Sequence, residues 1–230
     1  MQFFCTETRH QLLANQIDEK KIVVHYSGID CSKFEYHQRQ RVPGEPIKVL
    51  TIGRLIEKKG VVFAIEAVSH LLATGEKIDY TVVGDGVLRQ SFQQLIQDRG
   101  IERHVRLVGA KTHEEVKMFM EKSHVLLAPS LTSDSGDQEG IPNVIKEAMA
   151  SGLPVVSTFH SGIPELVSDG VSGLLVPERD AASLADALAY LISRPEICTE
   201  MGQAGRRQVE QKFDADSLNK RLEELYLGLM

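Results

Sequence analysis

The 230-residue chain has few cysteines and lacks any long apolar run. A helix that crosses a bilayer needs about 20 consecutive, mostly apolar residues, so the sequence predicts no transmembrane segment. Cys5, Cys31 and Cys198 lie far apart, which excludes a disulfide framework and a cysteine-based metal motif. The start of the chain lacks the basic and apolar regions of a signal peptide. These features indicate a reduced, cytoplasmic protein.

Positive charge is also scarce. The 26 Lys and Arg residues are outnumbered by 32 Asp and Glu residues, which gives a net charge of −6 and argues against a general nucleic-acid surface. The eight histidines are scattered without a close pair at helical spacing, so no structural metal is expected. The chain has no internal repeat and no low-complexity tract. Its 42% hydrophobic and 25% charged residues are ordinary for a soluble globular protein.

Short apolar runs alternate with helical patterns along most of the chain. The runs are continuous, as in parallel strands that are buried on both faces. We expect strands at 48–52, 80–83, 105–108, 124–128, 154–157 and 173–176. We expect helices near 60–74, 86–99, 113–121 and 142–151, and a turn near 162–167. This order predicts a doubly wound, Rossmann-like α/β fold, with a parallel sheet of about six strands between helices and ligands at the carboxyl ends of the strands.

The two ends of the chain differ from this pattern. Three further helices are expected at 181–193, 196–211 and 215–228, with Pro195 at the start of the second and Asp214 or Asp216 capping the third. Before the sheet, we expect a helix at 6–15, a strand at 22–26 and a polar linker at 35–45. One helix and one strand cannot bury a core of their own. We therefore divide the chain into a domain remnant with a hinge (1–45), a main domain (46–212) and a C-terminal helix (213–230).

The segment EGIPNVIKEAMASG is the most informative part of the sequence, because it places Glu139 and Glu147 eight positions apart. Pro142 is expected at the first helical position and Gly152 just past the helix end. The free N–H groups at the start of such a helix form an anion site. A carboxylate beside an anion site is unfavourable unless it binds hydroxyl groups, which sugars supply.

The same helix is expected to be amphipathic. At about 100° per residue, one face carries the apolar side chains Ile141, Val144, Ile145, Ala148 and Met149. The opposite face carries Asn143, Lys146 and Glu147, which we expect to lie away from the core.

Unusual residues follow the first three strands. After the first strand come Gly53, Arg54 and Lys59; an Arg fork and a Lys point charge across a turn suit a diphosphate. The second strand ends in Gly84-Asp85-Gly86, whose glycines permit a tight turn and close ligand approach. The third ends in Gly109-Ala110-Lys111, where the backbone is positioned to meet a nucleobase. For each segment taken alone, an ordinary solvated loop is the alternative.

The loops after the fourth and fifth strands carry weaker signals. The acidic stretch 133–138 leads directly into Glu139, and a disordered surface loop is its alternative interpretation. Asp134 and Asp137 are poor candidates for divalent-ion ligands, because two carboxylates in a flexible loop rarely suffice. A lone His160 is more often structural than catalytic, and Glu165 is a candidate cap for the local turn.

In this order, the motifs resemble the retaining glycosyltransferase family 4 (glycosyl transferases group 1), which has a GT-B fold and includes sucrose synthase and glycogen synthase. The resemblance runs from about residue 22 to 212 and implies the C-terminal, donor-binding half of a GT-B enzyme. The residues that carry it are Gly53-Arg54-Leu55, Lys59-Gly60, Val83-Gly84-Asp85-Gly86, Val108-Gly109, Pro129-Ser130, the segment from Glu139 to Val156, Ser161-Gly162-Ile163-Pro164-Glu165 and Gly170 to Val176.

The resemblance implies roles for individual residues. Arg54 and Lys59 would hold the donor diphosphate, Glu147 would bind the ribose hydroxyls, and Glu139 would lie near the transferred sugar. Glu139, Arg54 and Lys59 are thus the candidate catalytic residues. The implied donor-binding set is Gly53, Arg54, Lys59, Gly84, Gly109, Ala110, Lys111, Glu139, Gly140, Ile141, Pro142, Asn143, Val144 and Glu147. Neither a metal nor a cofactor is expected, and the donor is a nucleotide diphosphate sugar, with a UDP-sugar favoured over a GDP-sugar.

The chain departs from the family in three respects. Ser27 stands where the family usually has Asn, and Ser161 where it usually has Gly. The family's N-terminal domain, which binds the acceptor, is represented only by its last helix and strand. We expect a saccharide or lipid-linked acceptor to bind through that missing domain. The family's last helix packs on that domain, and here we expect residues 217–229 to pack elsewhere or against a second copy of the chain.

The implied function is retaining, hexosyltransferase-type transfer from a nucleotide sugar, in bacterial polysaccharide or glycoconjugate synthesis. Two alternatives stay open: a nucleotide-sugar-binding module that is inactive alone, and a sugar-nucleotide epimerase with the same fold. The expected location is the cytoplasm, with peripheral association at the inner face of the membrane as the alternative for a complete enzyme.

Overall fold

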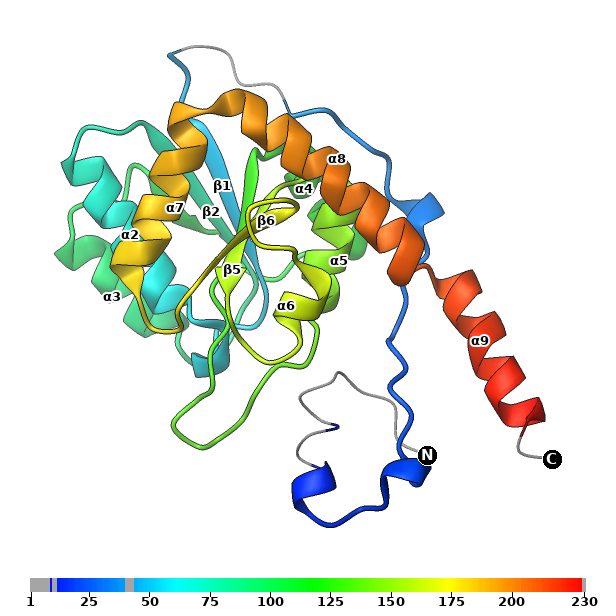
Figure 1. Cartoon of the computed structure of the whole chain (residues 1–230). Helices are drawn as coiled ribbons and strands as arrows, with labels where there is room; N and C mark the ends of the chain where they lie inside the picture. Colours follow the sequence, from blue (N-terminus) through cyan, green and yellow to red (C-terminus); the bar gives the residue numbers. More distant parts are fainter. Residues whose placement is uncertain (1–8, 10–11, 40–43, 229–230) are drawn as a thin grey trace.

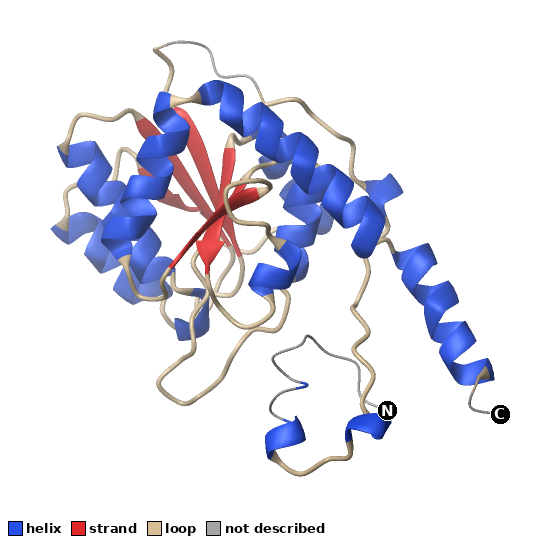
Figure 2. Ribbon diagram, viewed as in Figure 1, coloured by secondary structure: helices blue, strands red, loops and turns tan. Residues whose placement is uncertain are grey.

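The computed structural model describes residue 9 and residues 12–39 and 44–228, and it forms a parallel sheet between two layers of helices (Figures 1 and 2). The six strands run in the order β3-β2-β1-β4-β5-β6. They are β1 (Ile47–Ile52), β2 (Ile78–Val83), β3 (Val105–Leu107), β4 (Val125–Ala128), β5 (Val155–Thr158) and β6 (Gly173–Val176). All pairings are parallel, so the expected doubly wound α/β fold is confirmed.

Helices cover both faces of the sheet and enclose two apolar clusters. One face carries α2 (Val61–Ala73), α3 (Arg89–Asp98) and α7 (Ala181–Ser193). The other carries α4 (His113–Lys122), α5 (Asn143–Ala150) and the short α6 (Ile163–Leu166). The helix α8 (Pro195–Lys212) begins against the first cluster, through Cys198 and Met201, and ends against the second, through Val209. The last helix, α9 (Ala215–Leu227), extends away from the sheet (Figure 1).

The strand order reverses between β1 and β4, because β2 and β3 lie on one side of β1 and the later strands on the other. Loops that leave adjacent strands at such a reversal diverge, and they open a crevice at the carboxyl ends of the strands. The candidate residues after β1 and after β4 therefore face each other across this crevice.

Two expectations for the helix ends are confirmed. Pro195 is the first residue of α8. Asp214 precedes α9, and its side chain accepts a hydrogen bond from the Ser217 N–H. Among the described residues, no helix is both long and apolar enough to span a membrane.

The expected strand at 22–26 is wrong. These residues have no strand pairing, and the nearest pairing is an isolated bridge between Ile29 and Asp214. Val23 and Val24 favour a strand locally, but a strand also needs a partner with free backbone groups, and this segment runs beside the helical end of the chain instead. Of the helix expected at 6–15, Arg9 and residues 12–14 are helical, residue 15 is in a turn, and the rest lies outside the described residues. Two 3₁₀ turns, η1 (Glu19–Lys21) and η2 (Cys31–Lys33), complete this region.

The stretch expected as a polar linker at 35–45 includes a buried arginine. Arg39 is 5% exposed, and it closes the C-terminal ends of two helices at once, because the last carbonyls of a helix lack partners within the helix. Its guanidinium donates to the carbonyl oxygens of Met120, Glu121 and Ser123 at the C-terminal end of α4, and of Ser151 and Gly152 after α5. Burial lowers the pKa of Arg39 to about 10, so it is charged at neutral pH.

We expect Arg39→Ala to reduce the free energy of unfolding by about 3 kcal/mol, because buried carbonyl groups lose a charged hydrogen-bond donor. Urea unfolding measures this loss. The exposed Arg207→Ala is the control and should stay within about 0.5 kcal/mol of the wild type. Equal stability of the two variants would show that Arg39 is not a structural residue.

Lys146 of α5 is also placed differently from the expectation. It was expected on the solvent face, but it is 1% exposed. Its Nζ donates to the Ser27 carbonyl oxygen (2.5 Å) and lies 6.0 Å from the centre of the Phe213 ring. The hinge segment and the residue after α8 cover this second face of α5, and helical periodicity carries no information about such distant neighbours.

Burial lowers the pKa of Lys146 from 10.5 to about 8. The unfolded chain therefore binds more protons than the folded chain between these values, so stability contributed by this site rises with pH across that window. Between pH 8 and pH 10.5, we expect the free energy of unfolding of the wild type to rise by up to about 3 kcal/mol relative to that of Lys146→Met. Urea unfolding across this pH range tests the gain, with the exposed Lys220→Met as the control; a pH-independent difference would contradict it.

Candidate functional site

Three glycines bring the carboxyl ends of β1, β2 and β3 into backbone contact. The Gly53 N–H donates to the Val83 carbonyl (2.9 Å), and the Gly84 N–H donates to the Gly109 carbonyl (2.9 Å). Gly84 has a φ of +139°, and a Cβ on it would lie 1.8 Å from the Gly53 oxygen. No other residue fits this position, and the strand ends present backbone rather than side chains.

The short helix η3 (Glu57–Lys59) carries Lys58 and Lys59, two of the basic residues of the first loop. It ends at Gly60, which has a φ of +62°, and a Cβ there would lie 1.9 Å from the Pro129 carbonyl oxygen. Because of this close approach, η3 packs against the segment that follows β4. The Arg54 side chain is exposed, and it has no ion-pair partner among the described residues.

Lys58 and Lys59 both contact the candidate sugar-binding carboxylate. Lys59 Nζ donates to Glu139 Oε2 (2.8 Å), and Lys58 Nζ lies 3.4 Å from Glu139 Oε1. The three side chains are 12–16% exposed, so this cluster is screened by water less than a surface pair is. The structure thus joins Lys59 to Glu139, which are 80 positions apart in the sequence.

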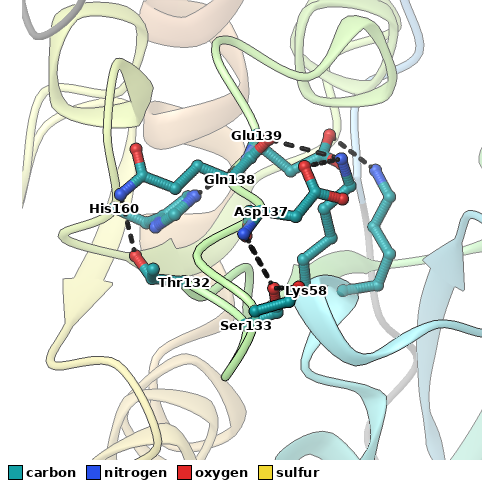
Figure 3. A network of polar contacts seen from close by, with 9 residues as sticks. Lys58, Thr132, Ser133, Asp137, Gln138, Glu139 and His160 are labelled. Atoms are coloured by element: carbon teal, nitrogen blue, oxygen red, sulfur yellow. Dashed lines mark hydrogen bonds and ion pairs between the residues drawn. The ribbon is translucent and has the colours of Figure 1, made fainter.

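The acidic loop before Glu139 is fastened at several points rather than free (Figure 3). The Ser133 N–H donates to the Asp137 carbonyl, and the Asp137 N–H donates to Ser133 Oγ. Lys58 Nζ lies 3.0 Å from Asp137 Oδ1. At the far side, Arg179 lies 2.8 Å from Asp134. The two aspartates weighed as ion ligands are therefore paired with basic groups, and the described residues contain no cluster of three metal-ligand side chains.

The helix α5 presents its open end to this cluster. Pro142 is the N-cap in extended conformation (ψ 128°), so Asn143, not Pro142 as expected, is the first helical residue. The N–H groups of Gly140, Ile141, Asn143 and Val144 have no hydrogen-bond partner among the described residues. Such a set of free donors suits anionic or hydroxyl oxygens. Gly152 (φ +75°) lies just past the helix end, as expected, and a Cβ on it would lie 2.6 Å from the Tyr36 ring.

Glu147 lies on the opposite side of α5 and faces α4. Burial raises the pKa of its carboxyl, and the nearby His113, Lys146 and Lys117 act against this rise. Two of these neighbours belong to α4, which begins directly after the Gly109–Lys111 loop. Ala110 and Lys111 are exposed in that loop. The structure therefore brings Glu147 toward the loop that was expected to meet the base.

The sequence analysis missed one part of this region. Glu178, which follows β6, links His160 to the Thr132 backbone, and His160 in turn contacts the Glu139 backbone. A histidine and a glutamate 18 positions apart, in loops after different strands, give no recognisable spacing in the sequence.

Comparison with known proteins identifies the family. The family described as Glycosyl transferases group 1 matches residues 32–208. The amylovoran biosynthesis glycosyltransferase AmsK of Erwinia amylovora is 41% identical over 94% of this chain and 53% of its own length. The putative colanic acid biosynthesis glycosyltransferase WcaL of Escherichia coli K12 is 39% identical over 91% of this chain and 52% of its own. The chain thus spans about half the length of these relatives.

Solved structures show the same architecture. HepE (Alr3699) of Anabaena, in complex with UDP and glucose, superposes with a TM-score of 0.85 at 20% identity. The match covers 98% of this chain and 62% of that one, so the described domain is one half of a GT-B fold. Since the family match spans most of the chain and the relatives agree with it, this chain belongs to the Glycosyl transferases group 1 family.

Proposed function

We propose that this chain is the donor-binding half of a retaining, hexosyltransferase-type enzyme that uses a nucleotide diphosphate sugar. The observation that carries the proposal is the Lys59–Glu139 pair, which faces the open end of α5 at the reversal of strand order. AmsK and WcaL are named for amylovoran and colanic acid biosynthesis, which supports polysaccharide synthesis as the setting. HepE was solved in complex with UDP and glucose, and we propose a UDP-sugar as the donor, with a GDP-sugar as the alternative.

In this proposal the basic residues stabilise the diphosphate leaving group. Arg54 supplies a planar fork and Lys59 a point charge, and the free N–H groups at the start of α5 add fixed dipoles. Groups arranged in advance around developing charge are an effective source of rate enhancement. A bound diphosphate competes with Glu139 for Lys59, and Lys58 at 3.4 Å then keeps the carboxylate paired beside the transferred sugar.

The nucleoside is held on the other side of α5. Glu147 accepts hydrogen bonds from the ribose hydroxyls, and the Gly109–Lys111 backbone flanks the base. A carboxyl whose pKa is raised by burial gains from such donors, because they replace the water that burial removes. Gly53 and Gly84 let the strand ends pack closely, so that backbone groups rather than side chains face the diphosphate there.

The acceptor belongs to a second half of the enzyme. We keep the division into residues 1–45, 46–212 and 213–230, with a saccharide or lipid-linked acceptor bound by an N-terminal domain and with a cytoplasmic location. The helix α9 buries only Leu218 among its described side chains, which leaves its outer surface for that domain or for a second copy. Because the chain spans half of its relatives, a nucleotide-sugar-binding module without transfer activity is the second candidate.

Calorimetry with UDP and with GDP tests the donor site. We expect Arg54→Ala to weaken diphosphate binding by about tenfold or more, since a hydrogen bond to a charged group contributes about 1.5–3 kcal/mol. Glu147→Ala should weaken binding of both UDP and uridine, because its partner is the ribose. The control is Arg103→Ala, an exposed residue before β3 at the opposite edge of the sheet.

Unchanged affinity in both site variants would refute the assignment. A transfer assay with a UDP-sugar then separates enzyme from binding module, and the anomeric configuration of the product tests retention. Altered donor stereochemistry without an acceptor would instead identify an epimerase.

A further inference from the structure

We propose that His160 and Glu178 are positioning residues that fix the backbone of Glu139, and so place its carboxylate against the transferred sugar. The inference rests on the proposed function for its consequence, but its geometry is independent of any ligand. Neither residue was expected to belong to the donor site.

His160 and Glu178 connect the two ends of one loop through three successive contacts. Thr132 and Glu139 lie at the ends of the acidic loop that follows β4 (Figure 3). The Glu139 N–H donates to His160 Nε2 (3.1 Å). His160 Nδ1 lies 2.6 Å from Glu178 Oε1, and Glu178 Oε2 accepts from the Thr132 N–H (2.9 Å). Loops after β5 and β6 thus hold both ends of a loop that leaves β4.

The partners determine the tautomer of the imidazole. A backbone N–H can only donate, so Nε2 of His160 must be unprotonated and must accept. The ring proton of the neutral form is then on Nδ1, where it donates to the Glu178 carboxylate. His160 is 1% exposed, so water does not substitute readily for either partner.

The backbone next to His160 is also constrained. Ser161 has a φ of +46°, in the left-handed region that disfavours non-glycine residues. Just before it, the His160 N–H donates to the Thr158 carbonyl (2.7 Å). An unfavourable conformation persists when its surroundings require it, and here the turn directs the imidazole at the Glu139 amide.

The charges around Glu139 indicate what its backbone hydrogen bond to His160 opposes. Lys58 and Lys59 attract the carboxylate from η3, while Glu178 holds the imidazole from the side of β6. Arg179, beside Glu178, is engaged with Glu57 and Asp134. With the His160 contact removed, the lysines are free to draw the whole Glu139 residue toward η3. The loss should therefore affect the sugar end of the donor and spare the nucleotide end.

The experiment compares binding of UDP-glucose and of UDP to the wild-type chain and to four variants by calorimetry at neutral pH. We expect His160→Phe to weaken UDP-glucose binding by about tenfold, the equivalent of one such hydrogen bond, and to leave UDP binding unchanged. His160→Gln should recover most of the affinity, because its amide oxygen can accept from the Glu139 N–H. Glu178→Gln should weaken UDP-glucose binding severalfold, because its NH₂ group opposes one of the two donors. The exposed His70→Phe is the control.

Nitrogen-15 NMR of the imidazole tests the geometry without a ligand. We expect a protonated Nδ1 and an unprotonated Nε2 for His160. A protonated Nε2, no selective loss in His160→Phe, or an equal loss of UDP and UDP-glucose would each overturn the inference. If the wild-type chain binds neither UDP-glucose nor GDP-mannose, the proposed function fails, and with it the role of His160 toward the sugar. The NMR result still decides whether His160 accepts a hydrogen bond from the Glu139 N–H.

Discussion

The site depends on one ion pair across the reversal of strand order. Lys59 lies in the loop after β1 and Glu139 in the loop after β4. The contact between their side chains joins these two diverging loops. Each group alone would be costly at this partly buried edge, since an unpaired charge there loses hydration without compensation. Together they place one cationic and one anionic side chain next to each other. A ligand that carries both phosphates and hydroxyls can contact both side chains.

The order of strands and helices was predictable because it depends on local signals. Continuous apolar runs such as 48–52 and 80–83 predicted buried strands, and Pro195 and Asp214 marked helix starts through short-range rules. The candidate site was predictable for a related reason, since Lys59, Glu139 and Glu147 lie in motifs whose spacing is fixed by a single loop or a single helix. Where the chain followed its own local preferences, the structure agrees with the sequence.

The differences arise from neighbours that are distant in the sequence. Arg39 looked like part of a linker because its partners are carbonyl groups at the C-terminal ends of α4 and α5, which no local pattern reveals. Lys146 looked exposed because periodicity cannot show that Ser27 and Phe213 cover a second face of α5. Val23 and Val24 have the composition of a strand but no strand to pair with. In each case a long-range contact overrode a correct local preference.

The path of α8 has a consequence for how the chain acquires its structure during synthesis. Cys198 and Met201 complete one apolar cluster and Val209 the other, so neither cluster is complete until α8 has been synthesised. The edge strand β6 also comes late, at Gly173–Val176. A nascent chain that ends before α8 exposes apolar surface on both faces of an incomplete sheet, which is the condition under which partly folded chains associate. Folding of this domain therefore waits for the synthesis of α8, because this one helix completes the apolar clusters on both faces of the sheet.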